Sequence, residues 1–105
     1  MATSPIEPVS VDEVPTQPTE FILEQNFPNP FNSATAIQYS IPQRGNVVLK
    51  VYDILGNEVK TLINEGKDQG VYTINFDANN LASGLYLYRI QASSFFETKK
   101  MILMK

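Results

Sequence analysis

Oxygen-bearing side chains that could hold a cation gather in one short stretch, which contains Asp77, Asn79 and Asn80. Carboxylate and amide oxygens in flexible loops are the ligands that Ca²⁺ prefers. No glutamate follows at the spacing of a bidentate calcium ligand, and Asx side chains also hydrogen-bond the backbone of their own turn. We therefore expect a turn here, with a calcium site as the alternative.

A second pair of acids, Asp53 and Glu58, flanks the sequence ILGN. Two carboxylates that hydrolyse a glycosidic bond face each other across a cleft, whereas a hairpin would place this pair across a turn. We expect Asp53 to cap that turn. The chain has no cysteine and no histidine, which removes thiolate nucleophiles, imidazole bases and the usual zinc ligands. We expect no enzyme, no metal and no other cofactor.

Tyrosines could form a platform that stacks on sugar rings, as in a carbohydrate-binding module. Four of the five tyrosines, Tyr52, Tyr72, Tyr86 and Tyr88, stand in apolar, strand-like runs. Aromatic rings in such runs are expected in or beside the core. Burial of these four rings would exclude a sugar-binding platform.

Charge is distributed unevenly along the chain, whose formal net charge is −3. Residues 1–20 contain Glu7, Asp12, Glu13 and Glu20 and no base, so residues 21–105 hold eight bases and seven acids, a net charge of +1. Without a basic stripe to neutralise phosphates, nucleic-acid binding is not expected. Apolar runs reach about four residues, far fewer than the roughly 20 that cross a bilayer, so no transmembrane segment is expected. No signal-peptide pattern occurs either.

Residues 1–20 are expected to form a disordered, acidic, proline-rich linker, because they hold four of the seven prolines and few apolar residues. The pairs Pro5 with Pro8 and Pro15 with Pro18 match the PxxP pattern of peptides that proline-binding modules recognise. A plain spacer is the favoured interpretation. Since the chain starts directly on this linker, we expect it to be a fragment of a longer protein.

Residues 21–105 are expected to form one all-β domain, because short apolar runs alternate with turn residues. Residues 47–52 alternate between an apolar and a mixed face, and residues 85–90 predict a central strand. Gly56 is expected in a tight hairpin with positive φ, residues 64–70 in a longer polar connection, and Gly84 just before a strand. About seven short strands at nearly regular spacing predict an antiparallel β-sandwich. The predicted strands are residues 21–25, 35–41, 46–54, 58–64, 71–77, 85–92 and 95–104.

The sequence NFPNPFN, residues 26–32, predicts a rigid corner. Pro28 and Pro30 lock φ on either side of Asn29 and remove two amide donors. An interior strand is therefore excluded. We expect Phe27 and Phe31 to insert their rings into the end of the sandwich and so fix how the linker enters the domain.

The chain closes on KKMILMK, residues 99–105. Terminal residues of soluble domains are usually polar and poorly ordered, so this apolar run is expected to be a strand of the sheet. Two interpretations stay open. The lysines guard an edge strand against unwanted pairing, or the segment is recognised by another molecule.

Several segments in the same order closely resemble the type A C-terminal sorting domain of the type IX secretion system of certain Gram-negative bacteria. The family's pattern combines a proline corner near the start with a lysine-rich apolar stop at the end. Ser33 stands where the family often has proline, and Asn57 where it often has arginine; both lie in expected loops. The segments are QNFPNPFN (25–32), TAIQYSIP (35–42), VVLKVYDILGNEVKTLINE (47–65), GVYTINFDANNLASGLYLYRIQA (70–92) and TKKMILMK (98–105).

The resemblance implies an immunoglobulin-like fold, shared with a domain of the flagellar hook-capping protein, and a sorting signal rather than an enzyme. Such a domain follows a larger cargo, is presented to an outer-membrane translocon and is usually removed by a surface sortase, here before Phe21. The cargo then reaches the cell surface or the medium. The structural motif would comprise Pro28, Asn29, Pro30, Phe31, Asn32, Gly56 and Gly84. The translocon would recognise Lys99, Lys100, Met101, Ile102, Leu103, Met104 and Lys105, by edge pairing or by capture of the terminal carboxylate.

Two functions from other classes remain as alternatives. One is a structural or adhesive immunoglobulin-like stalk domain of a surface protein. The other is a carbohydrate-binding module or small hydrolase.

Overall fold

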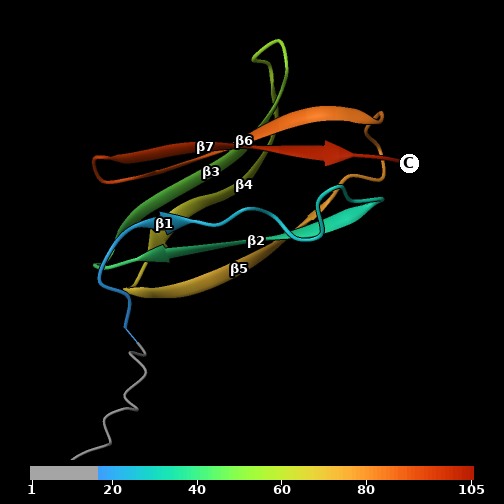
Figure 1. Ribbon diagram of the computed structural model, residues 1–105. Coiled ribbons are helices and arrows are strands. Elements are labelled where there is room, and N and C mark those ends of the chain that lie inside the picture. Colours follow the sequence, from blue (N-terminus) through green and yellow to red (C-terminus); the bar gives the residue numbers. More distant parts are fainter. Residues whose placement is uncertain (1–16) are drawn as a thin grey trace, which may run out of the picture.

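A computed structural model describes residues 17–105, which fold into seven strands without a helix (Figure 1). The expected linker and its PxxP pairs lie almost entirely outside the described residues. The predicted all-β class is confirmed, and each predicted strand is present with slightly different ends. The strands are β1 (Ile22–Leu23), β2 (Ala34–Ile41), β3 (Gly45–Asp53), β4 (Glu58–Lys67), β5 (Gly70–Asp77), β6 (Gly84–Ala92) and β7 (Phe95–Leu103).

The strands form two antiparallel sheets that face each other, as Figure 1 shows. One sheet has the order β1-β2-β5 and the other the order β4-β3-β6-β7. The chain changes sheet after β2, β4 and β5, which gives the crossing connections of an immunoglobulin-like sandwich. Because β4 pairs with β3, it extends the second sheet to four strands, and β7 forms that sheet's other edge.

The core lies between the sheets and is built by alternate residues of each strand. On β3, Val47, Leu49 and Val51 are fully buried, while the residues between them are half-buried. This confirms the two faces that the sequence predicts for β3. The expectation that β6 is a central strand is also confirmed, because it pairs with β3 on one side and β7 on the other.

The expected polar connection at residues 64–70 is wrong. β4 continues to Lys67, which pairs with Gly45, so only Asp68 and Gln69 separate it from β5. The start of β3 supplies the backbone partners for this longer part of β4. Its polar side chains are tolerated because β4 is an edge strand with a solvent-exposed side. An ion pair between Arg44 and Asp68 lies beside the turn.

A tyrosine at the start of β6 anchors the connection from β5. The hydroxyl of Tyr86 donates a hydrogen bond to the carbonyl of Ala82 at 2.7 Å. A tyrosine bonded to backbone a few residues upstream at this corner is a hallmark of immunoglobulin-like sandwiches. Residues 17–105 contain no helix that is long and apolar enough to cross a membrane.

Candidate functional site

The end of β7 divides its side chains between the core and solvent. Met101 and Leu103 are fully buried, whereas Ile102 and Met104 are 41% and 59% exposed. Lys100 is also exposed. Successive side chains of a strand point to opposite faces, so the predicted recognition segment forms two sets: one that packs and one that faces solvent.

The three lysines of this segment lie in different environments. Lys99 is half-buried and its Nζ lies 3.3 Å from a carboxylate oxygen of Glu97. Lys100 points to the opposite face of the sheet. Lys105 donates from its backbone N–H to Ser83 Oγ at 2.9 Å and from Nζ to the Asn79 carbonyl at 2.5 Å. The lysines therefore do not form one cationic cluster.

The proline corner binds the outer edge of β7. We call residues 25–32 the corner segment. The N–H of Phe31 donates to the Ile102 carbonyl at 2.9 Å, and the N–H of Met104 donates to the Phe31 carbonyl at 2.8 Å. In addition, the N–H of Ile102 donates to Asn29 Oδ1 at 2.9 Å. The corner segment thus pairs with β7 like a short extra strand.

Two amide side chains extend this contact in both directions along β7. Gln25 Nε2 donates to the Lys100 carbonyl at 2.6 Å, and Asn32 Nδ2 donates to the Met104 carbonyl at 3.3 Å. In Figure 1 the corner segment passes beside the end of β7 as the chain moves from β1 to β2. Edge pairing of a partner with residues 100–104 would require these bonds to open.

Asn26 holds the corner segment from inside the molecule and is 2% exposed. Its N–H donates to the Tyr88 hydroxyl at 2.8 Å, and its side-chain Nδ2 donates to Thr35 Oγ1 at 3.0 Å and to the Pro28 carbonyl at 3.1 Å. Sequence reasoning missed Asn26 as a buried residue. A buried amide stabilises a structure only when its hydrogen bonds are made, and here they tie the corner to β2 and β6.

Tyr88 connects this network to the central strand. Its hydroxyl donates to the Glu24 carbonyl at 2.7 Å while it accepts from Asn26. Burial raises the pKa of the Tyr88 hydroxyl to about 12. The hydroxyl therefore stays protonated and keeps both bonds at neutral pH.

The two phenylalanines of the corner have different roles. Phe31 is buried, with its ring centroid 6.2 Å from that of Phe76, as expected. The expectation that Phe27 also enters the sandwich is wrong, because this ring is 78% exposed. Phe27 pairs with Ala36 through two 3.0 Å backbone hydrogen bonds, and paired residues point to the same face of a sheet. Ala36 faces outward, so Phe27 does too.

The two glycines of the motif have unusual backbone conformations, Gly56 in the β3–β4 hairpin and Gly84 at the start of β6, where it pairs with Leu103 of β7. Gly56 has φ of +89° and Gly84 of +154°, values that favour glycine. Asp53 Oδ1 accepts from the N–H groups of Leu55 and Asn57, each at 2.9 Å. The Asn57 N–H is the main cause of a lowered pKa of Asp53. The prediction that Asp53 caps this hairpin turn is confirmed.

The remaining candidates for chemistry take part in local structure. Asp77 Oδ1 accepts the Asn79 N–H at 2.9 Å, which confirms the expected turn. Glu58 bonds Thr61 at 2.8 Å and pairs with Lys50 at 3.1 Å. Within residues 17–105, no three acidic, histidine or cysteine side chains gather as a metal-binding group would.

The tyrosines do not form an exposed platform for sugar. Tyr86 and Tyr88 are buried, and Tyr52 and Tyr72 are half-buried. The ring of Tyr72 stacks on Tyr39 at 5.4 Å. This placement confirms the core or half-core role that the sequence predicts.

Comparison with known protein families gives one match. The model described as the secretion system C-terminal sorting domain matches residues 25–104, from the corner segment through β7. A search of curated proteins gave no match. The family is one of sorting signals and not an enzyme family, and a stalk function is not favoured. Its members follow a cargo region and direct that cargo across the outer membrane to the cell surface or the extracellular space. The chain therefore belongs to the C-terminal sorting domains of the type IX secretion system.

Proposed function

We propose that the secretion machinery recognises the folded domain at the end of β7, residues 99–105, together with the corner segment. The observation that carries this proposal is the set of five hydrogen bonds between the corner segment and residues 100–104. These bonds make one surface from two segments at opposite ends of the domain. Recognition of that surface would therefore depend on the fold as well as on the terminal sequence.

Within this surface, the two faces of β7 have different tasks. Met101 and Leu103 hold the strand in the core, and Lys99 is engaged with Glu97. Lys100, Ile102 and Met104 face solvent, and their side chains are free to contact an outer-membrane translocon.

A surface sortase is the second proposed partner, and it would cut before Phe21. Regular backbone pairing starts with Ile22, which pairs with Ser40 on β2. Proteases cleave extended, unpaired backbone in preference to strands, and residues 1–20 are rich in proline and acid. This supports a division into a linker, residues 1–20, and a domain, residues 21–105.

The chain itself would perform no catalysis. Asp53 and Glu58, the strongest candidates for an acid and base pair, are engaged with a turn and with Lys50. The domain would act by being bound, as a signal is.

The test is export of a reporter cargo fused before this chain in a host with a type IX system. The variant Lys100→Ser, Ile102→Ser, Met104→Ser changes only exposed side chains, so the core residues of β7 stay in place. We expect the cargo to stay in the periplasm. A matched control, Val71→Ser with Thr73→Ser, changes exposed residues of β5 on the other sheet.

Thermal unfolding of each purified chain shows whether the fold survives. Deletion of residues 99–105 serves as a second variant that removes the whole segment. Export of the triple variant at the level of the control would refute the proposal.

A further inference from the structure

One face of the four-stranded sheet carries apolar and cationic side chains together. We call it the outer face, the solvent-exposed side of β3, β6 and β7. The strand register sets Tyr52, Leu87 and Lys100 in one row and Lys50, Arg89 and Thr98 in the next. The outer face consists of every second residue from Val48 to Tyr52, from Leu85 to Gln91 and from Phe96 to Ile102.

The outer face has more cations than it has acids to neutralise them. Lys50 pairs with Glu58, the neighbouring acid on β4, at 3.1 Å. Among the described residues, no carboxylate lies within ion-pair distance of Arg89 or Lys100. Elsewhere, Lys67 and Lys99 each pair with an acid on their own strand. Two neighbouring cations on one face thus have no ionic partner within residues 17–105.

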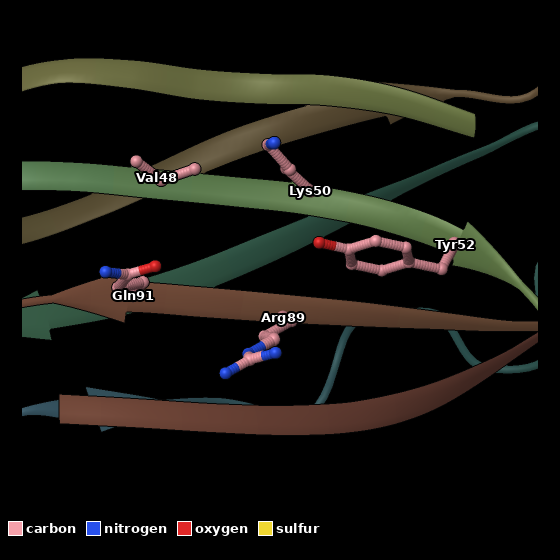
Figure 2. Close-up of a pocket in the computed structure, with 5 residues that line it drawn as sticks. All are labelled: Val48, Lys50, Tyr52, Arg89 and Gln91. Carbon is pink, nitrogen blue, oxygen red and sulfur yellow. The ribbon is translucent and has the colours of Figure 1, made fainter. Parts of the chain in front are cut away.

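A hollow lies on the outer face between β3 and β6, beside Arg89, whose guanidinium points toward β7 (Figure 2). It has a volume of about 110 Å³ and is lined by Val48, Lys50, Tyr52, Arg89 and Gln91. In Figure 2 the Tyr52 ring lies over the space between β3 and β6, with its hydroxyl toward the middle of the hollow. Tyr52 and Arg89 also line a neighbouring hollow with Leu87 and Thr98.

Arg89 is held in position by an aromatic ring. Its guanidinium carbon lies 4.9 Å from the ring centroid of Phe96, which is 49% exposed. A guanidinium stacked on a ring keeps its N–H groups free for two parallel bonds to a carboxylate. At the other end of the face, Leu85 and Ile102 pair across the strands and are 40% and 41% exposed.

We infer that the outer face docks on an acidic, partly apolar protein surface of the secretion machinery, with a partner carboxylate bound by the guanidinium of Arg89 at the edge of this hollow. This inference rests on the proposed function and extends it from the end of β7 across β6 to β3. Charge complementarity selects the partner, because two cations that have no ionic partner in the described part of the chain, beside exposed leucine and isoleucine, match carboxylates set among apolar groups. Tyrosine and arginine are also the side chains that most often dominate a protein interface.

The test is a pair of charge reversals in the same cargo fusion. Arg89→Glu changes the hollow, while Lys60→Glu makes the same charge change on β4, beside Phe76 and Leu81 and away from the outer face. Lys60 is exposed and has no ion pair among the described residues. We expect Arg89→Glu to lower export at least about tenfold and Lys60→Glu to leave it unchanged. Arg89→Lys, which keeps the charge but loses the paired N–H donors, should have an intermediate effect.

Thermal unfolding of the Arg89→Glu and Lys60→Glu chains shows whether either substitution impairs folding. Tyr52→Phe is a second variant that removes only the hydroxyl. Equal export of Arg89→Glu and Lys60→Glu would overturn the inference. If the triple variant at Lys100, Ile102 and Met104 still fails in that case, the proposed function stands without it.

The experiment also distinguishes two other partners that could occupy the outer face. The same comparison is made in a fusion that lacks residues 1–16. If Arg89→Glu no longer lowers export of that shorter fusion, the partner of the outer face is the acidic segment of this chain and the inference is wrong. If the purified chain binds vesicles of anionic phospholipid and Arg89→Glu abolishes that binding, the partner is a lipid surface, which also overturns it.

Discussion

Asn29 and Ile102 are 73 positions apart in the chain, yet Asn29 Oδ1 accepts the backbone N–H of Ile102 at 2.9 Å. The N–H of Ile102 points away from the sheet at the edge strand β7. It is hydrogen-bonded by the side chain of Asn29, which lies between two prolines. Edge strands with unpaired backbone groups invite pairing with other chains. The corner segment therefore protects the end of β7 while it holds that end in place.

The first prediction is that Asn29→Ala loosens the end of β7 without unfolding the domain. Loss of one hydrogen bond should lower the free energy of unfolding by about 0.5–1.5 kcal/mol. Native-state hydrogen exchange should show faster exchange of the Ile102 and Met104 amides. Asn32→Ala, which removes a longer bond of 3.3 Å, is the control and should have a smaller effect. Unchanged exchange at Ile102 in Asn29→Ala would contradict the prediction.

The second prediction separates the two phenylalanines of the corner. Phe31→Ala should lower the free energy of unfolding by about 3–5 kcal/mol, since it leaves a cavity in the core. Phe27→Ala should change it by no more than about 0.5 kcal/mol, because that ring is exposed. Urea denaturation of both variants measures the difference. Similar losses of stability for the two would show that Phe27 packs more tightly than its exposure indicates.

The third prediction compares two buried tyrosines. Tyr88→Phe removes a hydroxyl that bonds Glu24 and Asn26. This leaves the buried N–H of Asn26 and the partly buried carbonyl of Glu24 unpaired, which should cost about 1–3 kcal/mol. The Tyr39 hydroxyl is buried and has no hydrogen-bond partner among the described residues. Tyr39→Phe should therefore be neutral or stabilising. Equilibrium unfolding at neutral pH checks both, and a Tyr39→Phe chain less stable than Tyr88→Phe would refute this account.

The fourth prediction concerns the response of the domain to alkali, which depends on the same tyrosine. The folded-state pKa of Tyr88 is raised to about 12, above the value of about 10 for tyrosine in an unfolded chain. Its contribution to stability is complete below pH of about 10 and is lost as pH rises through the folded pKa. The melting temperature should fall over this window, and the fall should be smaller in Tyr88→Phe. A fall of equal size in the variant would assign it to other groups.

The fifth prediction concerns acid and the hairpin turn. The pKa of Asp53 is lowered, first by the Asn57 N–H, so its ionised form stabilises the fold at pH values above the unfolded pKa of about 4. That contribution is lost as pH falls through the folded pKa. The melting temperature of Asp53→Ala should lie below that of the unmodified chain at pH 7, and the two should converge in acid. A gap that stays constant with pH would exclude the ionised carboxylate as the cause.

Most of the fold follows from local sequence patterns. Alternation on β3, glycine at the hairpin and the double proline each report the conformation of neighbouring residues, so the strands and the corner could be predicted. The turn roles of Asp53 and Asp77 were also accessible, because these carboxylates bond N–H groups a few residues away. The extra length of β4 was missed because its polar residues are stabilised by a distant partner, the start of β3.

The sequence by itself determined that this chain is a seven-stranded sandwich and that its two most distinctive motifs lie near the start and the end of the domain. Only the tertiary structure decided that Asn29 and Phe31 of the first motif bond directly to the second. It also decided that Phe27 faces solvent and that Lys99 pairs with Glu97 whereas Lys100 has no such contact among the described residues. The reason is physical: periodicity records which face a residue occupies within its own strand, whereas the contacts of that face depend on how distant strands pair.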